Sequence, residues 1–150
     1  MPNTFEGGKL TLTTEIATSL SVGVWSTIAG TWTASNLEHF DSPSNGELRH
    51  LGTSPREYKC IVNFIINGGG NDDIGVRVRK WDNSASAFVD GTEIRRQVNN
   101  IVGGRDVAFY NISFNIELDQ NDYVFFQVRN NTDNTNITLE LDSDFVIEER

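Results

Sequence analysis

The run DVAFYNISFNIELDQNDYVFFQVRN, residues 106–130, decides the fold that the rest of the chain must join. Its first half places an apolar residue at every second position: Ala108, Tyr110, Ile112, Phe114, Ile116 and Leu118. Successive side chains of a strand point to opposite faces, so this period predicts a strand with one face in a core. The polar turn 119–122 follows, and the alternation resumes with Val124, Phe126 and Val128. The run therefore predicts two half-buried strands separated by a turn.

The opposite faces of these two strands also carry large apolar groups. Tyr123 and Phe125 alternate with the core set of the second strand, and Val107 and Phe109 do so at the start of the first. A strand that faces water on one side normally has polar residues there. A sheet that is apolar on both faces needs a second partner to cover it.

The rest of the chain has the same character. Alternation over 57–67 and 74–81 predicts two more strands, and the glycine-rich segment 68–72 between them is typical of a hairpin loop. Residues 10–34 are rich in Thr, Val, Ile and Trp, and 46–51 follows a turn as a short candidate strand. Residues 92–99 fit either one helical turn or an edge strand. Together these segments predict an all-β antiparallel β-sandwich, a jelly roll of about eight to ten strands in a single domain over residues 1–150.

The net charge of -9 argues against a nucleic-acid partner, because phosphate binding needs clustered Lys and Arg. The one dense basic patch is Arg77, Arg79 and Lys80, which we interpret as a solvated strand face with acidic neighbours. Cys60 is in phase with a core face, so it reads as a small core residue. No apolar run approaches the ~20 residues of a membrane span, and the start lacks the pattern of a signal peptide. We expect a protein made in a cytoplasm, without a membrane partner.

No motif indicates catalysis or a cofactor, and we expect a protein that is not an enzyme. His39 and His50 have no partner at metal-ligand spacing and read as surface residues. No Gly-x-Ser-x-Gly motif occurs, and the glycines at 68–70 precede a strand rather than the helix of a phosphate cradle. Acidic pairs in loops leave a structural Ca²⁺ open, although none has EF-hand spacing; they are Asp72 with Asp73, Asp119 with Asp122, and Asp142 with Asp144. Turn chemistry explains these acidic pairs better, because Asp accepts hydrogen bonds from local backbone donors.

Bulky aromatic residues carry the functional signal, and six stand out: Trp25, Trp32, Trp81, Phe109, Tyr123 and Phe125. Each of them alone fits packing under a loop or in a second core layer. As a group they favour an oligomer interface, because a large rigid ring buries much area at small entropic cost. We therefore predict an interface formed by four of them, namely Trp81, Phe109, Tyr123 and Phe125.

Several segments also resemble a known group of proteins. Residues 121–130, the run 135–139 and the ending 145–147 resemble the last strands of small jelly-roll proteins in bacteriophage and other virus particles, and 46–58 is similar to their central strand entry. Such proteins look like the trimeric heads of the tumour necrosis factor and complement type. The resemblance covers about two thirds of the chain through general strand and turn patterns. Asn121 stands where those heads often have glycine, and no collagen stalk is present. Both departures favour the viral relatives over an animal extracellular role.

The resemblance implies a non-enzymatic virion protein: a capsid decoration protein, head fibre or tail-associated knob at the virion surface. Its implied partners are two further copies of itself, in a homotrimer, and a major capsid or other virion protein. Residues 1–10, with Gly7 and Gly8, would then form a docking arm. The alternative is a carbohydrate-binding, lectin-like module, in which Trp25 or Trp32 and the Asn-rich loop 130–136 contact a host-surface glycan.

Overall fold

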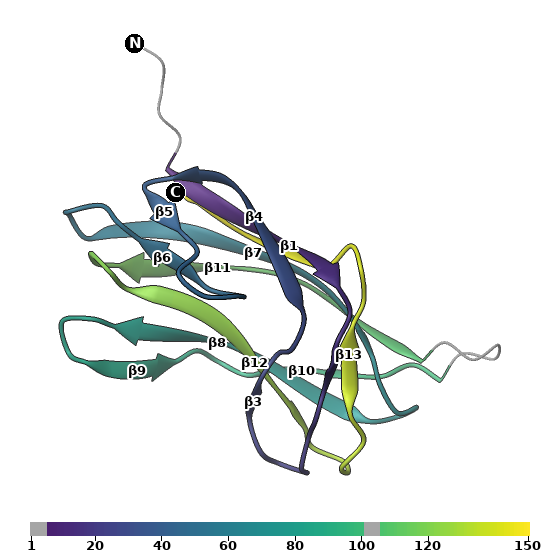
Figure 1. The fold of residues 1–150 in the computed structure, drawn as a ribbon. Coiled ribbons are helices and arrows are strands. Elements are labelled where there is room, and N and C mark those ends of the chain that lie inside the picture. Colours follow the sequence, from purple (N-terminus) through teal and green to yellow (C-terminus); the bar gives the residue numbers. More distant parts are fainter. Residues whose placement is uncertain (1–5, 101–105) are drawn as a thin grey trace.

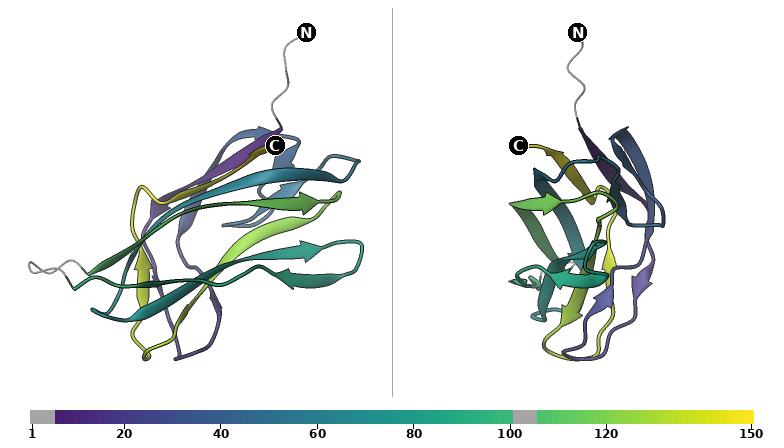
Figure 2. Two further views of the ribbon diagram at one scale, coloured as in Figure 1. Left: turned by 180° about the vertical axis from the view of Figure 1, so that it is seen from behind. Right: turned by 90° about the vertical axis from the view of Figure 1, so that its left-hand side faces the viewer.

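The computed structural model describes residues 6–100 and 106–150, and the regular elements in this part of the chain are all strands (Figure 1). The strands form two antiparallel sheets that face each other across one core, as two views show (Figures 1 and 2). This confirms the prediction of an all-β sandwich of the jelly-roll type.

Among the described residues, the first sheet is built around the long central strand β7 (Arg56–Asn67). One side of β7 pairs with two strands in succession: β13 (Ile137–Leu139), next to which lies β2 (Ala17–Thr18), and β14 (Asp144–Glu149), beyond which lie β1 (Gly7–Thr14) and β4 (Thr31–Glu38). On the other side lies β11 (Val107–Leu118), which pairs with β7 along its whole length. In the described chain β11 is thus the strand at this edge of the sheet.

The second sheet is built around β8 (Asp73–Asp82) and β12 (Tyr123–Asn130). Their further neighbours are β3 (Ser26–Thr27), β5 (Phe40–Asp41), β6 (Leu48–His50), β9 (Ala87–Asp90) and β10 (Ile94–Gln97). β9 and β10 both pair with the outer side of β8. β10 also settles the ambiguous segment 92–99 as an edge strand, because its backbone bonds to β8 instead of closing a helical turn.

The turns 68–72 and 119–122 are corners between the two sheets. The hairpin predicted at 68–72 is wrong, because β7 pairs with β11 and β8 with β12, so the chain changes sheets there. Both corners have the same chemistry: Asn71 and Asn121 adopt positive φ angles, and each precedes a buried aspartate. Asp122 accepts hydrogen bonds from the backbone of Asp119 at 2.9 Å and of Asn83 at 2.8 Å. As expected for an aspartate in a turn, this carboxylate is used in hydrogen bonds from backbone donors.

A cluster of aromatic rings joins the sheets across the core. Phe126 of β12 lies 4.8 Å from the ring of Phe145 and 5.2 Å from that of Phe64, both in the first sheet. Trp32 of β4 packs edge-on to Phe145 at 5.6 Å. Such edge-to-face contacts add to the free energy gained from burial. Trp32 is therefore half-buried and packs against the core.

Part of the predicted docking arm over residues 1–10 belongs to a strand of the first sheet. Residues 1–5 lie outside the described residues, whereas Gly7 to Leu10 belong to β1 and pair with both β14 and β4. Gly7 serves close packing here, because a Cβ at this position would collide with the carbonyl oxygen of Ile147.

Glu6, just before β1, is held by a polar network that buries one of the two histidines. Its carboxylate accepts a hydrogen bond from the Tyr58 hydroxyl at 2.7 Å and lies 2.7 Å from His39 Nδ1 and 3.0 Å from Arg56. The Tyr58 hydroxyl is also 2.9 Å from His50 Nε2, and His50 is only 1% exposed. The prediction that His50 is a surface residue is wrong, since a buried tyrosine and a backbone carbonyl satisfy its ring nitrogens.

We expect Phe126→Ala to lower the free energy of unfolding by about 3–5 kcal/mol, because it opens a cavity between the sheets. Phe88→Ala is the matched control, since Phe88 is 42% exposed and its loss removes surface contacts with Trp81 and Arg79, at a cost of about 1 kcal/mol. Urea titrations at equal protomer concentration measure both. Equal destabilisation by the two substitutions would contradict this account of the core.

The Glu6 network predicts acid sensitivity. The Tyr58 hydrogen bond lowers the pKa of Glu6 below its ordinary value of 4.5, with further help from His39 and Arg56. A lowered pKa means that the carboxylate stabilises the fold above about pH 4.5, and this contribution is lost as pH falls through the folded-state pKa. Glu6→Gln should therefore flatten the decline of stability between about pH 5 and 3, and cost on the order of 1 kcal/mol at pH 7.

Urea titrations across this pH range measure that change. Glu57→Gln is the control, because Glu57 is more exposed and pairs with Arg150 outside the network. A Glu6→Gln variant with the wild-type pH profile would show that the network adds nothing to stability.

Candidate functional site

The structure divides the four predicted interface residues between two faces. Trp81, Tyr123 and Phe125 lie on the outward face of the second sheet, because they alternate with the core residues of β8 and β12. Phe109 lies on the outward face of the first sheet, where it is 50% exposed. A single flat interface cannot hold all four, since the sandwich core separates them.

Strand register explains why aromatic rings gather on the second sheet. Tyr123 is opposite Trp81, and Trp81 is opposite Phe88, so three rings form a row across β12, β8 and β9. Trp81 lies 4.9 Å from Phe88 and 6.2 Å from Tyr123, nearly parallel to the latter. Phe125 joins them 5.9 Å from Phe88. Cross-strand neighbours stand close enough for such rings to touch.

Trp25, in the loop before β3, lies further along the same sheet, past the row of Phe125 and Arg79. Two guanidinium groups contact its ring, Arg77 at 4.2 Å and Arg129 at 4.6 Å from the centroid. We name the set Trp25, Trp81, Phe88, Tyr123 and Phe125 the aromatic face. The sequence showed four of these residues as bulky outward groups but gave no sign of Phe88, whose position depends on the pairing of β9 with β8.

The arginines of this face all have acidic partners. Arg79 donates to Asp90 at 2.9 Å, and Arg77 lies 3.4 Å from the same carboxylate. Arg129 forms two hydrogen bonds of 2.7 Å to Glu93, which raise the pKa of Arg129 and lower that of Glu93. The prediction that Arg77 and Arg79 have acidic neighbours is confirmed.

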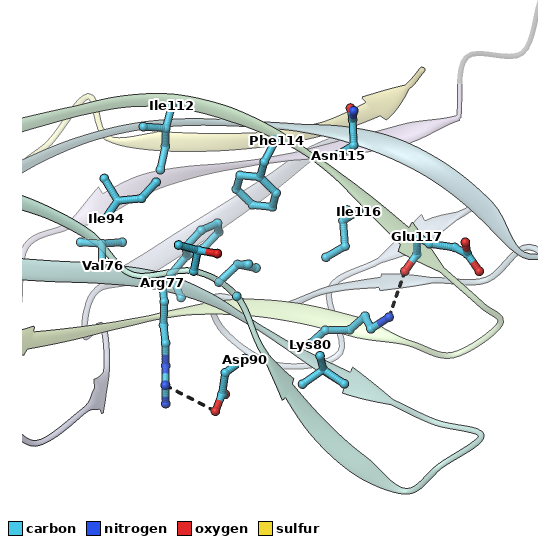
Figure 3. A pocket seen from close by; sticks show the side chains of 15 residues that line it. Val76, Arg77, Lys80, Asp90, Ile94, Ile112, Phe114, Asn115, Ile116 and Glu117 are labelled. Atoms are coloured by element: carbon cyan, nitrogen blue, oxygen red, sulfur yellow. Dashed lines mark hydrogen bonds and ion pairs between the residues drawn. The ribbon is translucent and has the colours of Figure 1, made fainter.

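An apolar opening lies at the edge of the sandwich, between β11 and the strands β8 and β10. It has a volume of about 370 Å³, and its side chains point toward one another from the two sheets (Figure 3). We name it the edge slot, defined by Val76, Val78, Ile94, Ile112, Phe114 and Ile116. The Lys80 ammonium crosses its rim to the carbonyl oxygen of Glu117 at 3.1 Å.

A second apolar surface covers the outward face of the first sheet. Phe109 is opposite Ile65, and Ile61 is opposite Val146, so two apolar pairs lie on this face with the row of Asn63 between them. We name this set the first-sheet face. Asn63 and Ser113 lie among these residues, so the surface mixes apolar and hydrogen-bonding groups.

The described residues contain no group of three or more His, Cys, Asp or Glu side chains arranged to hold a metal ion. Asp72 is buried and accepts a hydrogen bond from the Asn130 amide at 3.0 Å. Burial raises the pKa of the Cys60 thiol, so little reactive thiolate forms. The part of the chain that the structure describes holds no helix that is both long and apolar enough to cross a membrane.

Comparisons of sequence found no match, either to a protein-family model or to a curated protein. Comparison of structures found clear matches. The Eiger TNF of S. frugiperda superposes with a TM-score of 0.71 and 10% identity, covering 97% of this chain and 92% of that one. Murine APRIL at pH 5.0 gives a TM-score of 0.69 and 8% identity, over 97% and 99% of the two chains.

These identities are too low to transfer a function, and neither matched structure is described as part of a virus particle. The virion role implied by the resemblance is therefore still a hypothesis. What the matches do support is the architecture, since they span nearly the whole of both chains. The chain has a jelly-roll fold of the tumour necrosis factor type.

Proposed function

We propose that this chain is a non-enzymatic structural protein that assembles as a homotrimer and docks on the surface of a virus particle. The observation that supports the assembly is the presence of two unlike surfaces with apolar side chains, the edge slot and the first-sheet face. The virion assignment and the capsid or other virion partner rest on the sequence resemblance. The proposed site of synthesis is the host cytoplasm.

The edge of β11 needs a cover. β11 is twelve residues long, and its pairing among the described residues is with β7 on one side, plus one bridge from Val107 to Asn99 on the other. A long open edge beside apolar side chains recruits other chains unless it is protected. The half-buried side chains of Ile112, Phe114 and Ile116 line the slot directly beside this edge.

The first-sheet face supplies a cover of the right kind on a second copy. An edge that packs against a face is a heterologous contact, and such contacts close into a ring when the rotation between copies allows it. Three copies is the number implied by the resemblance to trimeric heads. Each copy then covers its neighbour's slot and offers its own slot to the third.

Carbohydrate binding is the alternative, and one observation favours it: the partly exposed aromatic face lies on the sheet opposite the first-sheet face. The packing of the chain changes which residues could form a carbohydrate site. Trp32 packs against the core, and the buried amide of Asn130 bonds to Asp133 and to the backbone of Thr135, which leaves Trp25.

For the wild-type chain we expect a mass of three times 16.8 kDa by sedimentation equilibrium, persisting on dilution. Ile116→Lys should yield folded monomers by placing a charge in the slot, and Phe109→Lys should do so by placing one on the face. Val22→Lys is the control, because Val22 is 48% exposed outside both surfaces. A wild-type protein that is monomeric at all concentrations would rule out the assembly.

Mixing the two variants tests the heterologous geometry. Phe109→Lys keeps an intact slot and Ile116→Lys an intact face, so one good contact can form between them and the ring cannot close. The mixture should contain a species of two subunits that neither variant forms alone. Monomers only, in a mixture at concentrations well above those of wild-type assembly, would contradict an edge-to-face contact.

The particle role has its own test. If the proposal is right, the chain should remain with virus particles through a density gradient, and antibodies against it should label their surface in electron micrographs. Chemical cross-linking of intact particles should join it to a capsid or other virion protein. A protein absent from purified particles would refute the role and leave the trimer untouched.

A further inference from the structure

The aromatic face is partly exposed and held rigid: Phe88 is exposed, Trp25, Trp81 and Tyr123 are half-buried, and Phe125 is buried. Phe88 is 42% exposed although its ring touches Trp81 and Phe125 and lies 4.2 Å below the Arg79 guanidinium. Because neighbouring rings and a cation fix each side chain, a ligand that packs on them causes little further loss of rotamer freedom. Rigid, partly exposed rings of this kind are suited to binding.

Hydrogen-bonding groups alternate with the rings. In the row next to Trp81, Arg79 stands between Phe125 and Asp90, and it bonds to that carboxylate at 2.9 Å. In the following row Arg77 donates twice to Gln127 Oε1, at 2.9 and 2.7 Å. A guanidinium has five N–H donors and a carboxylate about four acceptor positions, so both retain capacity for a ligand.

The charges of this face nearly cancel, because three carboxylates partner four arginines. Arg77 and Arg79 are offset by Asp90, Arg129 by Glu93, and Arg49 at the far side of Tyr123 by Asp41. An anionic ligand would find arginines already occupied on a chain of net charge -9, and long-range repulsion would slow its approach. The ligand that fits is uncharged.

A buried protein interface fits less well. The cores of protein interfaces are depleted in charged residues. The reason is that removing an ion pair from water costs several kcal/mol per ion unless the geometry of the pair is excellent. Here the Arg79–Asp90 pair stands within the array of rings. A ligand that covers the rings but leaves these groups hydrated or hydrogen-bonded to hydroxyls avoids that cost.

Pyranose rings combine flat C–H faces with a dense rim of uncharged hydroxyls. We propose that the aromatic face binds a neutral oligosaccharide, with Trp81 and Tyr123 stacked on sugar rings and the Arg79–Asp90 pair bonded to hydroxyls. None of the five rings of this face lines the edge slot, although Asp90 does, so the stacking surface itself lies outside the slot that a second copy would cover. The inference thus goes beyond the assembly role, although three copies would raise avidity.

The test uses the full chain on an array of neutral oligosaccharides of glucose, galactose, mannose and N-acetylglucosamine, with sialylated and sulfated glycans alongside. We expect binding within the neutral set, followed by isothermal titration with the best binder. Trp81→Ala and Tyr123→Ala should each weaken that binding by about tenfold or more, which is a loss of about 1.4 kcal/mol. Trp81→Phe should recover part of it, because a ring for stacking remains.

Leu141→Ala is the control, since Leu141 is 47% exposed just before β14 of the other sheet, outside both assembly surfaces, and should leave sugar binding unchanged. Circular dichroism and sedimentation of every variant separate a loss of the site from a loss of fold or assembly. The proposal is overturned by a neutral set that shows no binding at about 1 mM sugar. It is equally overturned by preference for anionic glycans, or by binding that survives both ring deletions.

Discussion

The pleat of strand β12 is the constraint on which this molecule depends. Its core side holds Phe126 against Phe64 and Phe145, and these edge-to-face contacts join the two sheets. Because side chains alternate along a strand, the residues between must point outward, and two of those are Tyr123 and Phe125. The packing that closes the core therefore also presents rings on the outside.

The core of the sandwich is covered on one side and partly open on the other. On one side Trp32 extends the aromatic cluster and closes the core beneath β4. On the other side the edges of β11 and of β8 with β10 leave the slot between them, and the side chains of Ile112, Phe114 and Ile116 are only half-buried. A domain of this size has enough apolar area to fill its interior, so an open apolar edge is more consistent with assembly than with a failed core.

The placement of charged residues also distinguishes the two outward faces of the sandwich. The chain carries a net charge of -9, yet the arginines beside the aromatic face are matched by nearby carboxylates, and Glu6 bonds into a network with Tyr58 at the start of β1. Paired charges keep a surface polar without making it strongly attractive to ions. This arrangement leaves apolar contact and neutral hydrogen bonding as the interactions that distinguish the two outward faces.

The sequence by itself determined the strands at 57–67, 74–81 and 106–130, the all-β sandwich and the outward position of Tyr123 and Phe125, because alternation along a strand is a local property. Only the tertiary structure decided which strands share a sheet, since pairing depends on residues far apart in the chain. For that reason the turn at 68–72 proved a corner, His50 proved buried against Tyr58, and Phe109 lies on the opposite face from Trp81. The edge slot and the complete aromatic face could not be predicted from the sequence for the same reason. Each is built by strands that come together only when the sheets form.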